Sequence, residues 1–144
     1  MSYLKEHPID ESWFRNKVTP QTVEYADMFA KNLAKGDRRE TLALTTSQLR
    51  RFFGAMKNLQ MNIQISGFNE SEFVMLKPQL AYAVGRAYKN NGSFNHYKID
   101  DFKDVLSKAI DIVNTSEDKD LAFNNFIKFF EAIVAYHKVY GKDN

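Results

Sequence analysis

Apolar residues recur at intervals of three and four positions along most of the 144-residue chain, which is the spacing of one face of an α-helix. Turn-forming residues interrupt this pattern, as at Ser66-Gly67 and at Asn90-Asn91-Gly92. No segment keeps the period-two alternation of a half-buried strand for more than a few residues. The pattern therefore predicts helices at about residues 22–34, 45–63, 69–87, 100–113 and 117–140.

Several helix ends carry signals of their own. Thr19 is a candidate N-cap for the first helix, and Thr45 and Gln48 have the spacing of a capping box at the start of the second. Pro78 lacks an N–H group and clashes with the preceding turn, so we expect a kink or a break there. Gly141 follows the last helix and is expected to take the left-handed conformation of a C-cap.

The residue types that make turns are scarce. With 6 glycines and 3 prolines, the chain is poorly suited to a many-stranded β fold. We therefore expect an all-α fold, a compact bundle of five to six helices, with residues 19–144 as a single domain and residues 1–18 as an N-terminal arm whose order stays open. Trp13 and Phe14 in this arm have two explanations, because they can dock on the bundle itself or fill a pocket on another subunit.

Composition limits the cellular location and the classes of partner that the chain can have. It has no cysteine, which excludes disulfides and thiolate metal sites and suits the reducing cytoplasm, the expected location. No apolar run approaches the roughly 20 residues needed to cross a membrane, so we expect no membrane partner. Lysine and arginine total 20 against 18 acidic residues, for a net charge of +2. A polyanion would therefore have to bind a local basic patch.

No motif for catalysis is present. The zinc-binding, phosphate-binding and nucleophile-elbow motifs are all missing, and the three histidines lie far apart in the sequence. Asp100-Asp101 is best explained by capping and macrodipole stabilisation at a helix start. His137 falls on the apolar side of the last helix and is expected to be a hydrogen-bonded core histidine. The sequence predicts no catalytic residue, no metal ligand and no cofactor.

The second predicted helix has basic flanks on either side of its apolar face. Arg50 and Lys57 share one outer flank with Gly54, and Arg51 lies on the other. No acidic residue occurs between residues 41 and 70. An exposed glycine within a helix costs up to about 1 kcal/mol relative to alanine, so Gly54 suggests a close approach by another helix or a sugar-phosphate strand.

The third predicted helix repeats this arrangement. When its apolar residues face inward, the opposite face carries Tyr82, Gly85, Arg86 and Lys89. Cations beside an aromatic ring suit a nucleic-acid strand, because the cations neutralise phosphates and the ring stacks on a base or contacts a sugar. A solvated helix face explains the same pattern, so the faces alone leave both explanations open.

Three stretches together resemble one family. They are "LTTSQLRRFF" (44–53), "LKPQLAYAVGRAY" (76–88) and "FIKFFEAIVAYHKVYG" (126–141). In this order they resemble the small subunit of the type III-A CRISPR effector, the Csm complex. The co-occurrence is far more specific than any one stretch, and residues 1–43 carry no such signature.

The resemblance implies a helical bundle without catalytic activity. Copies would associate head to tail in an inner filament that lies along the guide RNA and target RNA, beside other Csm subunits, and holds the RNA by its backbone without reading bases. Arg50, Arg51 and Arg86 lie in the first two motifs and Lys138 lies in the third. The expected RNA-binding residues are Arg50, Arg51, Lys57, Tyr82, Arg86, Lys89 and Lys138.

Two other function classes compete with RNA binding. In the first, the chain is a purely structural adaptor whose basic faces meet acidic surfaces of protein partners and never RNA. In the second, it is a helical hydrolase, which the lack of any candidate site makes the weakest of the three. The sequence does not fix the oligomeric state of the isolated chain or its copy number in a complex.

Overall fold

A computed structural model describes residues 3–37 and 40–141 of the chain and shows an all-α fold, as predicted. Residues 1–2 of the predicted arm and residues 38–39 and 142–144 of the predicted domain lie outside the described residues. Within the described residues the helices are α1 (Tyr3–Glu6), α2 (Ser12–Arg15), α3 (Pro20–Ala34), α4 (Thr46–Ser66), α5 (Glu70–Val74), α6 (Leu76–Asn90), α7 (Lys98–Asn114) and α8 (Lys119–Tyr140). Five of these described helices have 15 residues or more, which agrees with the predicted bundle.

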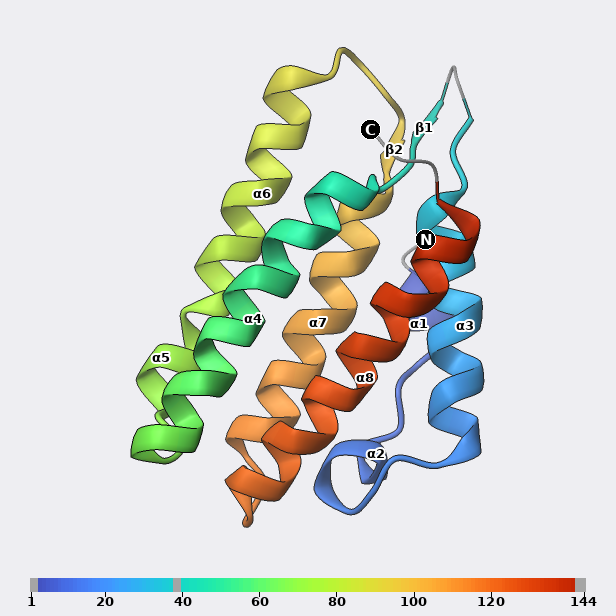
Figure 1. Cartoon of the computed structure of the whole chain (residues 1–144). Coiled ribbons are helices and arrows are strands. Elements are labelled where there is room, and N and C mark those ends of the chain that lie inside the picture. Colours follow the sequence, from blue (N-terminus) through green and yellow to red (C-terminus); the bar gives the residue numbers. More distant parts are fainter. Residues whose placement is uncertain (1–2, 38–39, 142–144) are drawn as a thin grey trace.

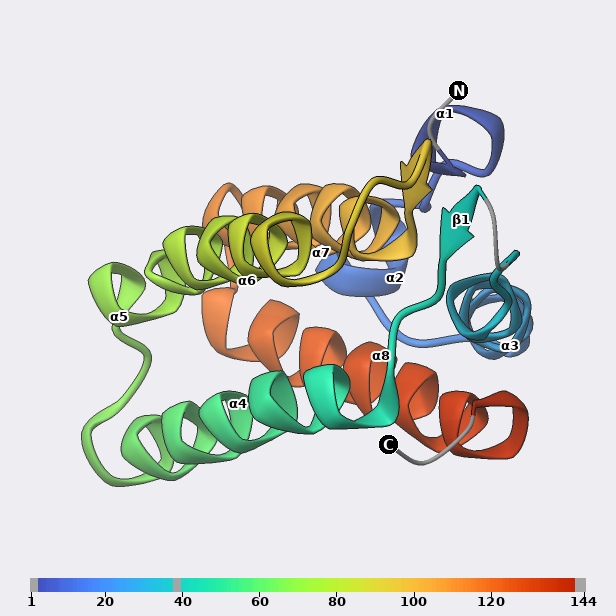
Figure 2. The same ribbon diagram turned by 90° about the horizontal axis from the view of Figure 1, so that it is seen from above.

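The long helices pack in two layers, and α8 is the helix at the centre of their contacts. Figure 2 shows α6 and α7 side by side in one layer and α4 and α8 in the other, with α3 closing one end. Helix α8 contacts α3, α4 and α7, and α6 packs on α7. The buried residues of α8 include Phe123, Phe126 and Phe130. Its buried aromatic residues therefore make α8 the central helix, and Figure 1 shows the C-terminal half of α8 beside α3.

The helix starts confirm the capping signals in the sequence. The Thr19 hydroxyl accepts a hydrogen bond from the N–H of Thr22, and the Thr45 hydroxyl accepts one from the N–H of Gln48 at 3.1 Å. The Gln48 side chain accepts in return from the Thr45 N–H at 2.8 Å, so α4 begins with a complete capping box. This cap sets the register that turns Arg50 and Arg51 outward.

The N-terminal segment packs on the bundle instead of projecting from it. Trp13 and Phe14 on α2 are buried, and the Phe14 ring meets the Phe129 ring edge-on with centroids 5.3 Å apart. The buried Asn125 side chain donates to the Phe14 carbonyl at 2.9 Å. Of the two explanations for these aromatic residues, docking on their own bundle is confirmed.

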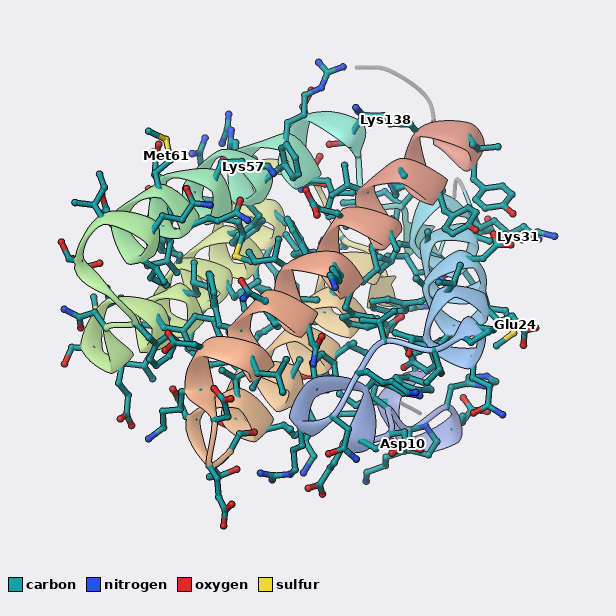
Figure 3. All side chains as sticks on the ribbon, turned by 60° about the horizontal axis from the view of Figure 1, so that its bottom comes forward. Asp10, Glu24, Lys31, Lys57, Met61 and Lys138 are labelled. Carbon is teal, nitrogen blue, oxygen red and sulfur yellow. The ribbon has the colours of Figure 1, made fainter. Side chains whose placement is uncertain are left out.

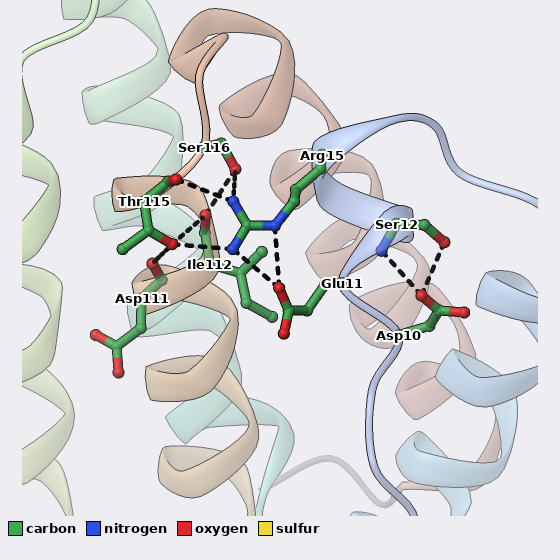
Figure 4. Close-up of polar contacts among 8 residues, drawn as sticks. All are labelled: Asp10, Glu11, Ser12, Arg15, Asp111, Ile112, Thr115 and Ser116. Carbon is green, nitrogen blue, oxygen red and sulfur yellow. Dashed lines mark hydrogen bonds and ion pairs between the residues drawn. The ribbon is translucent and has the colours of Figure 1, made fainter.

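Arg15 fastens the same segment to the turn between α7 and α8 (Figure 4). Its guanidinium donates to the carbonyl and the hydroxyl of Thr115, each at 3.0 Å, and to the Ser116 hydroxyl at 3.3 Å. It also pairs with the Glu11 carboxylate at 2.9 Å. A cation with this many internal partners has a structural role.

The structure differs from several of the sequence-based expectations. A two-stranded parallel sheet, β1 (Thr41–Leu42) with β2 (His96–Tyr97), joins two loops. The predicted break at Pro78 lies at Met75, because Pro78 fits in the first turn of α6, where its missing N–H has no intrahelical partner to lose.

The expected left-handed cap at Gly141 is wrong. Its backbone is extended, with φ −83° and ψ 161°, so no positive φ demands glycine there. Glycine is needed for space instead, since a Cβ at this position would lie 2.7 Å from Cε1 of His137.

Candidate nucleic-acid interface

Burial of the apolar face of α4 leaves its arginines in solvent. Leu49, Phe52 and Met56 are buried against the bundle, and at 100° per residue this turns Arg50 and Arg51 outward. Both arginines are exposed. The first turn of α4 contains no acidic residue.

Helix α6 presents a matching face. Leu80 and Ala87 are buried, so Tyr82, Arg86 and Lys89 lie on the outer side and are exposed. The Tyr82 side chain is 69% exposed. The Arg86 guanidinium lies 5.9 Å from the centre of the Tyr82 ring, within the range of a cation–π contact. Tyr82 therefore also contacts Arg86 of its own helix.

A groove between α4 and α6 brings the two basic faces together. Its volume is about 520 Å³. Arg51 reaches it from α4, while Tyr82 and Arg86 line it from α6. No acidic residue lines it among the residues that the structure describes. The lining residues are Ser47, Gln48, Arg51, Phe52, Pro78, Gln79, Tyr82, Ala83, Arg86, Ala87, Asn90, Asn91 and Ile99.

Among the described residues, the cations at and beside the groove have no acidic partner. Within residues 3–37 and 40–141, none of the ion pairs includes Arg51, Arg86 or Lys89. An arginine keeps its positive charge at any physiological pH. The groove therefore has an uncompensated positive rim that suits a polyanion.

The other predicted residues do not line the groove. Lys57 on α4 forms an ion pair with Glu131 of α8, with 2.8 Å between Nζ and Oε2, and its Nζ lies 5.2 Å from the Phe53 ring centre. Lys138 is exposed near the end of α8. Figure 3 shows Lys57 on α4 and Lys138 on α8. Of the seven predicted residues, Arg51, Tyr82 and Arg86 line the groove, and Arg50, Lys57, Lys89 and Lys138 do not.

Two amide side chains at the groove were missed by the sequence reasoning. Gln79 and Asn90 line it, and neither side chain has a hydrogen-bond partner within the part of the chain that the structure describes. A signal for them existed, because residues 79, 82, 83, 86 and 90 follow one another along a single helical stripe. The amides were missed because only charged and aromatic residues on this helix were considered as RNA ligands.

Polar groups elsewhere in the bundle serve the fold. His137 is fully buried, and its Nε2–H donates to the Leu44 carbonyl at 2.8 Å, which confirms the predicted core histidine. Burial lowers the pKa of His137, because the charged ring would lose its hydration. No cluster of three or more metal-ligating side chains occurs within the described residues.

The carboxylate pair at 100–101 lies in the first turn of α7, as expected from the macrodipole, but the predicted capping is wrong. The helix begins at Lys98, and no side chain bonds its N-terminus. The buried Asp101 instead accepts hydrogen bonds from His96 at 3.0 Å and from Asn32 at 3.4 Å. It therefore joins α3, β2 and α7.

Comparison with known proteins identifies one family. Residues 16–143 match the family model described as Csm2 Type III-A. A curated protein of Streptococcus thermophilus, described as "CRISPR system Cms protein Csm2", is 29% identical over 115 residues, which cover 78% of this chain and 85% of that protein. No solved structure matches the chain. No helix among the described residues has the length and apolar character required to cross a membrane.

Proposed function

This chain belongs to the Csm2 type III-A family, the small subunit of the Csm complex, and on this premise we propose that it is a non-catalytic scaffold that binds RNA. It holds guide and target RNA by contacts to the sugar-phosphate backbone and does not read their sequence. It acts beside other Csm subunits in the cytoplasm, a setting that the lack of cysteine suits.

One observation carries this proposal. Arg51 and Arg86 reach the same groove from different helices, and neither takes part in an ion pair within the described residues. Two such cations neutralise neighbouring phosphates and release the counterions held there, which is the main source of sequence-independent affinity for nucleic acids. Backbone contacts of this kind position a strand without specifying its bases.

The remaining predicted residues extend the same surface. Arg50 and Lys89 are exposed on the two helices that form the groove, and they contact phosphates on either side of it. Lys138 on α8 contributes a further positive charge. Lys57 contributes least, because the carboxylate of Glu131 at 2.8 Å already offsets its charge.

We further propose that copies of the chain associate head to tail. Large apolar side chains are exposed at the end of the molecule formed by the second half of α4 and by the α5–α6 turn: Ile65 is 80% exposed, Met61 59% and Met75 54%. Exposed large apolar side chains that gather at one end of a molecule favour a protein partner. A heterologous contact that does not close into a ring repeats along a filament, so each copy needs only a few cations.

The structural adaptor stays the second candidate, because the groove has apolar residues at its centre and can also accept a protein side chain. The two candidates differ in whether RNA touches α4 and α6. The test is ultraviolet cross-linking of the complex that a tagged chain brings down from its host, followed by mass spectrometry of the cross-linked peptides.

We expect short RNA to co-purify with larger subunits, and we expect cross-links on peptides that contain Arg51 or Tyr82. The turn that holds Arg15 serves as an internal control without cross-links, since that arginine is occupied by protein groups. Recovery of the larger subunits with no cross-link on α4 or α6 would support the adaptor and reject RNA binding at the groove.

A further inference from the structure

The groove between α4 and α6 has a floor that phosphate binding does not require. Phe52, Ala87 and Ile99 line it and are almost completely buried in the bundle, and Ala83 lies beside them. The two alanines add little side-chain volume on the α6 side. The volume of about 520 Å³ lies in the range of small-molecule pockets, about 300–1,000 Å³. A site for phosphates alone would need neither this depth nor an apolar floor.

Amide side chains surround this floor. Gln79 and Asn90 have no hydrogen-bond partner in the described chain. Gln48 is engaged only through its oxygen, which accepts from the Thr45 N–H, and Asn91 through its nitrogen, which donates to the Ala87 carbonyl at 2.9 Å. An amide carries both donors and an acceptor. The rim therefore offers both kinds of partner around an apolar centre.

We propose that the groove holds one unpaired nucleobase of the bound RNA strand, an inference that rests on the proposed function. A base has apolar faces and an edge of donors and acceptors, which is the pattern that the floor and the amides complement. Tyr82, with its ring 69% exposed, stacks on the base from above, and Arg51 and Arg86 contact the phosphates on either side of it.

This arrangement favours a nucleotide over an acidic peptide. A peptide helix that docks in a groove uses a row of large apolar anchors, whereas four of the thirteen lining residues are amides and two are arginines. The amides give the groove a polar rim suited to a base edge. Since the groove contacts the base through adaptable amides and an aromatic face, it accepts any base and does not impose a sequence.

The test compares two strands with equal phosphate counts. The full-length chain is titrated with an oligouridylate of about ten nucleotides, a length within the usual range of single-strand sites, and with an abasic oligonucleotide of the same length. We expect the oligouridylate to bind about tenfold more tightly, which corresponds to about 1.4 kcal/mol. Both strands should show the same salt dependence, because their phosphate contacts are the same.

A filled groove gives the matched comparison. Ala83→Leu places a larger side chain in the groove, and Ala81→Leu makes the same change at an exposed position of α6 that does not line it. Ala83→Leu should abolish the tenfold preference and keep the affinity for the abasic strand, whereas Ala81→Leu should keep both. Circular dichroism confirms that each variant is folded.

Three results would overturn the inference. Equal affinity of the unchanged chain for the two strands would remove the base site and leave phosphate binding in place. A preference that survives Ala83→Leu would place the base elsewhere and assign the groove to another occupant, such as a protein side chain. Failure of the unchanged chain to bind either strand would also overturn the base site, whereas the proposed function is tested separately by cross-linking of the assembled complex, in which the contacts of many copies add up.

Discussion

The side of the bundle that carries α2 is closed by buried side chains, whereas the side between α4 and α6 is open. Phe14 on α2 is fully buried and stacks edge-on with Phe129. Tyr82 on α6 is 69% exposed beside a groove of about 520 Å³. One chain thus uses aromatic residues in two ways, to stabilise its own fold on one side and to offer a surface to a partner on the other.

The arginines of these two regions differ in the same way. Arg15 has the Thr115 carbonyl and hydroxyl, the Ser116 hydroxyl and the Glu11 carboxylate around its guanidinium. Among the residues that the structure describes, Arg86 has only the face of Tyr82, at 5.9 Å. A cation that is satisfied within the protein contributes to stability, and one without an acidic partner is available to a phosphate. The surroundings of each arginine, and not its charge, separate the two roles.

The largest expected effect comes from breaking the closed side. Phe14→Ala removes a fully buried ring, and we expect the free energy of unfolding to fall by about 3–5 kcal/mol because a cavity is left behind. The matched change on the open side, Tyr82→Ala, should alter it by less than about 0.5 kcal/mol. Urea denaturation of the two variants measures both. A similar loss for both would show that the α6 face also holds the fold together.

Arg15→Ala should come next. The guanidinium donates three hydrogen bonds to the turn between α7 and α8, and their loss should cost about 1–2 kcal/mol of folding stability, since the site is partly open to solvent. Its affinity for RNA should stay unchanged. Arg51→Ala should show the opposite pattern, with unchanged stability and weaker RNA binding. Thermal melts and RNA titrations of the two variants check this; a loss of RNA affinity in Arg15→Ala would contradict the division of roles.

Glycine substitutions sharpen the comparison further. A Cβ at Gly54 would meet nothing within 4 Å, so Gly54→Ala should stabilise α4 by up to about 1 kcal/mol. Gly141→Ala, where a Cβ would lie 2.7 Å from the His137 ring, should destabilise the protein. If RNA approaches the backbone at Gly54, the first variant will bind RNA less tightly although it is more stable. Denaturation midpoints that fall in both variants would contradict the open environment of Gly54.

The last expected effect concerns the protonation of His137. It leaves folding stability at neutral pH unchanged and lowers it only on acidification. Burial lowers the pKa of this histidine in the folded state, so below the unfolded value of about 6.5 the unfolded chain takes up a proton that the folded chain does not. Its contribution to stability is thus complete above that pH and falls as the pH drops. In His137→Gln this part of the decline should be missing. Denaturation of both proteins from neutral to mildly acidic pH measures it, and identical slopes would rule it out.

Local signals in the sequence predicted most of the helices. The capping box of Thr45 and Gln48 and the apolar stripes of the long helices depend on residues within a few positions of one another, so they can be read directly. The strands β1 and β2 were missed because two residues are too few to show a period. Pro78 was read correctly as a sign of interruption, but the break lies at Met75, since proline is tolerated in a first helical turn.

The candidate site could be predicted only in part, because it depends on contacts between distant segments. The helical wheel identified Arg51 and Arg86 as outward residues, but it could not show that both line one groove. The ion pair of Lys57 joins it to a residue 74 positions away, so no local pattern announces it. The amides of Gln79 and Asn90 could be identified as candidate ligands only once the structure showed that they line the groove.

The salt dependence of RNA affinity tests the central claim most directly. We would titrate a single-stranded oligonucleotide into the unchanged chain, into Arg51→Ala/Arg86→Ala and into Arg15→Ala at several salt concentrations. If the two groove arginines neutralise phosphates, the slope of log affinity against log salt should become shallower by about 0.7 for each arginine removed from the groove, and it should stay unchanged in Arg15→Ala. An unchanged slope in the double variant would contradict the claim that these residues hold the RNA backbone.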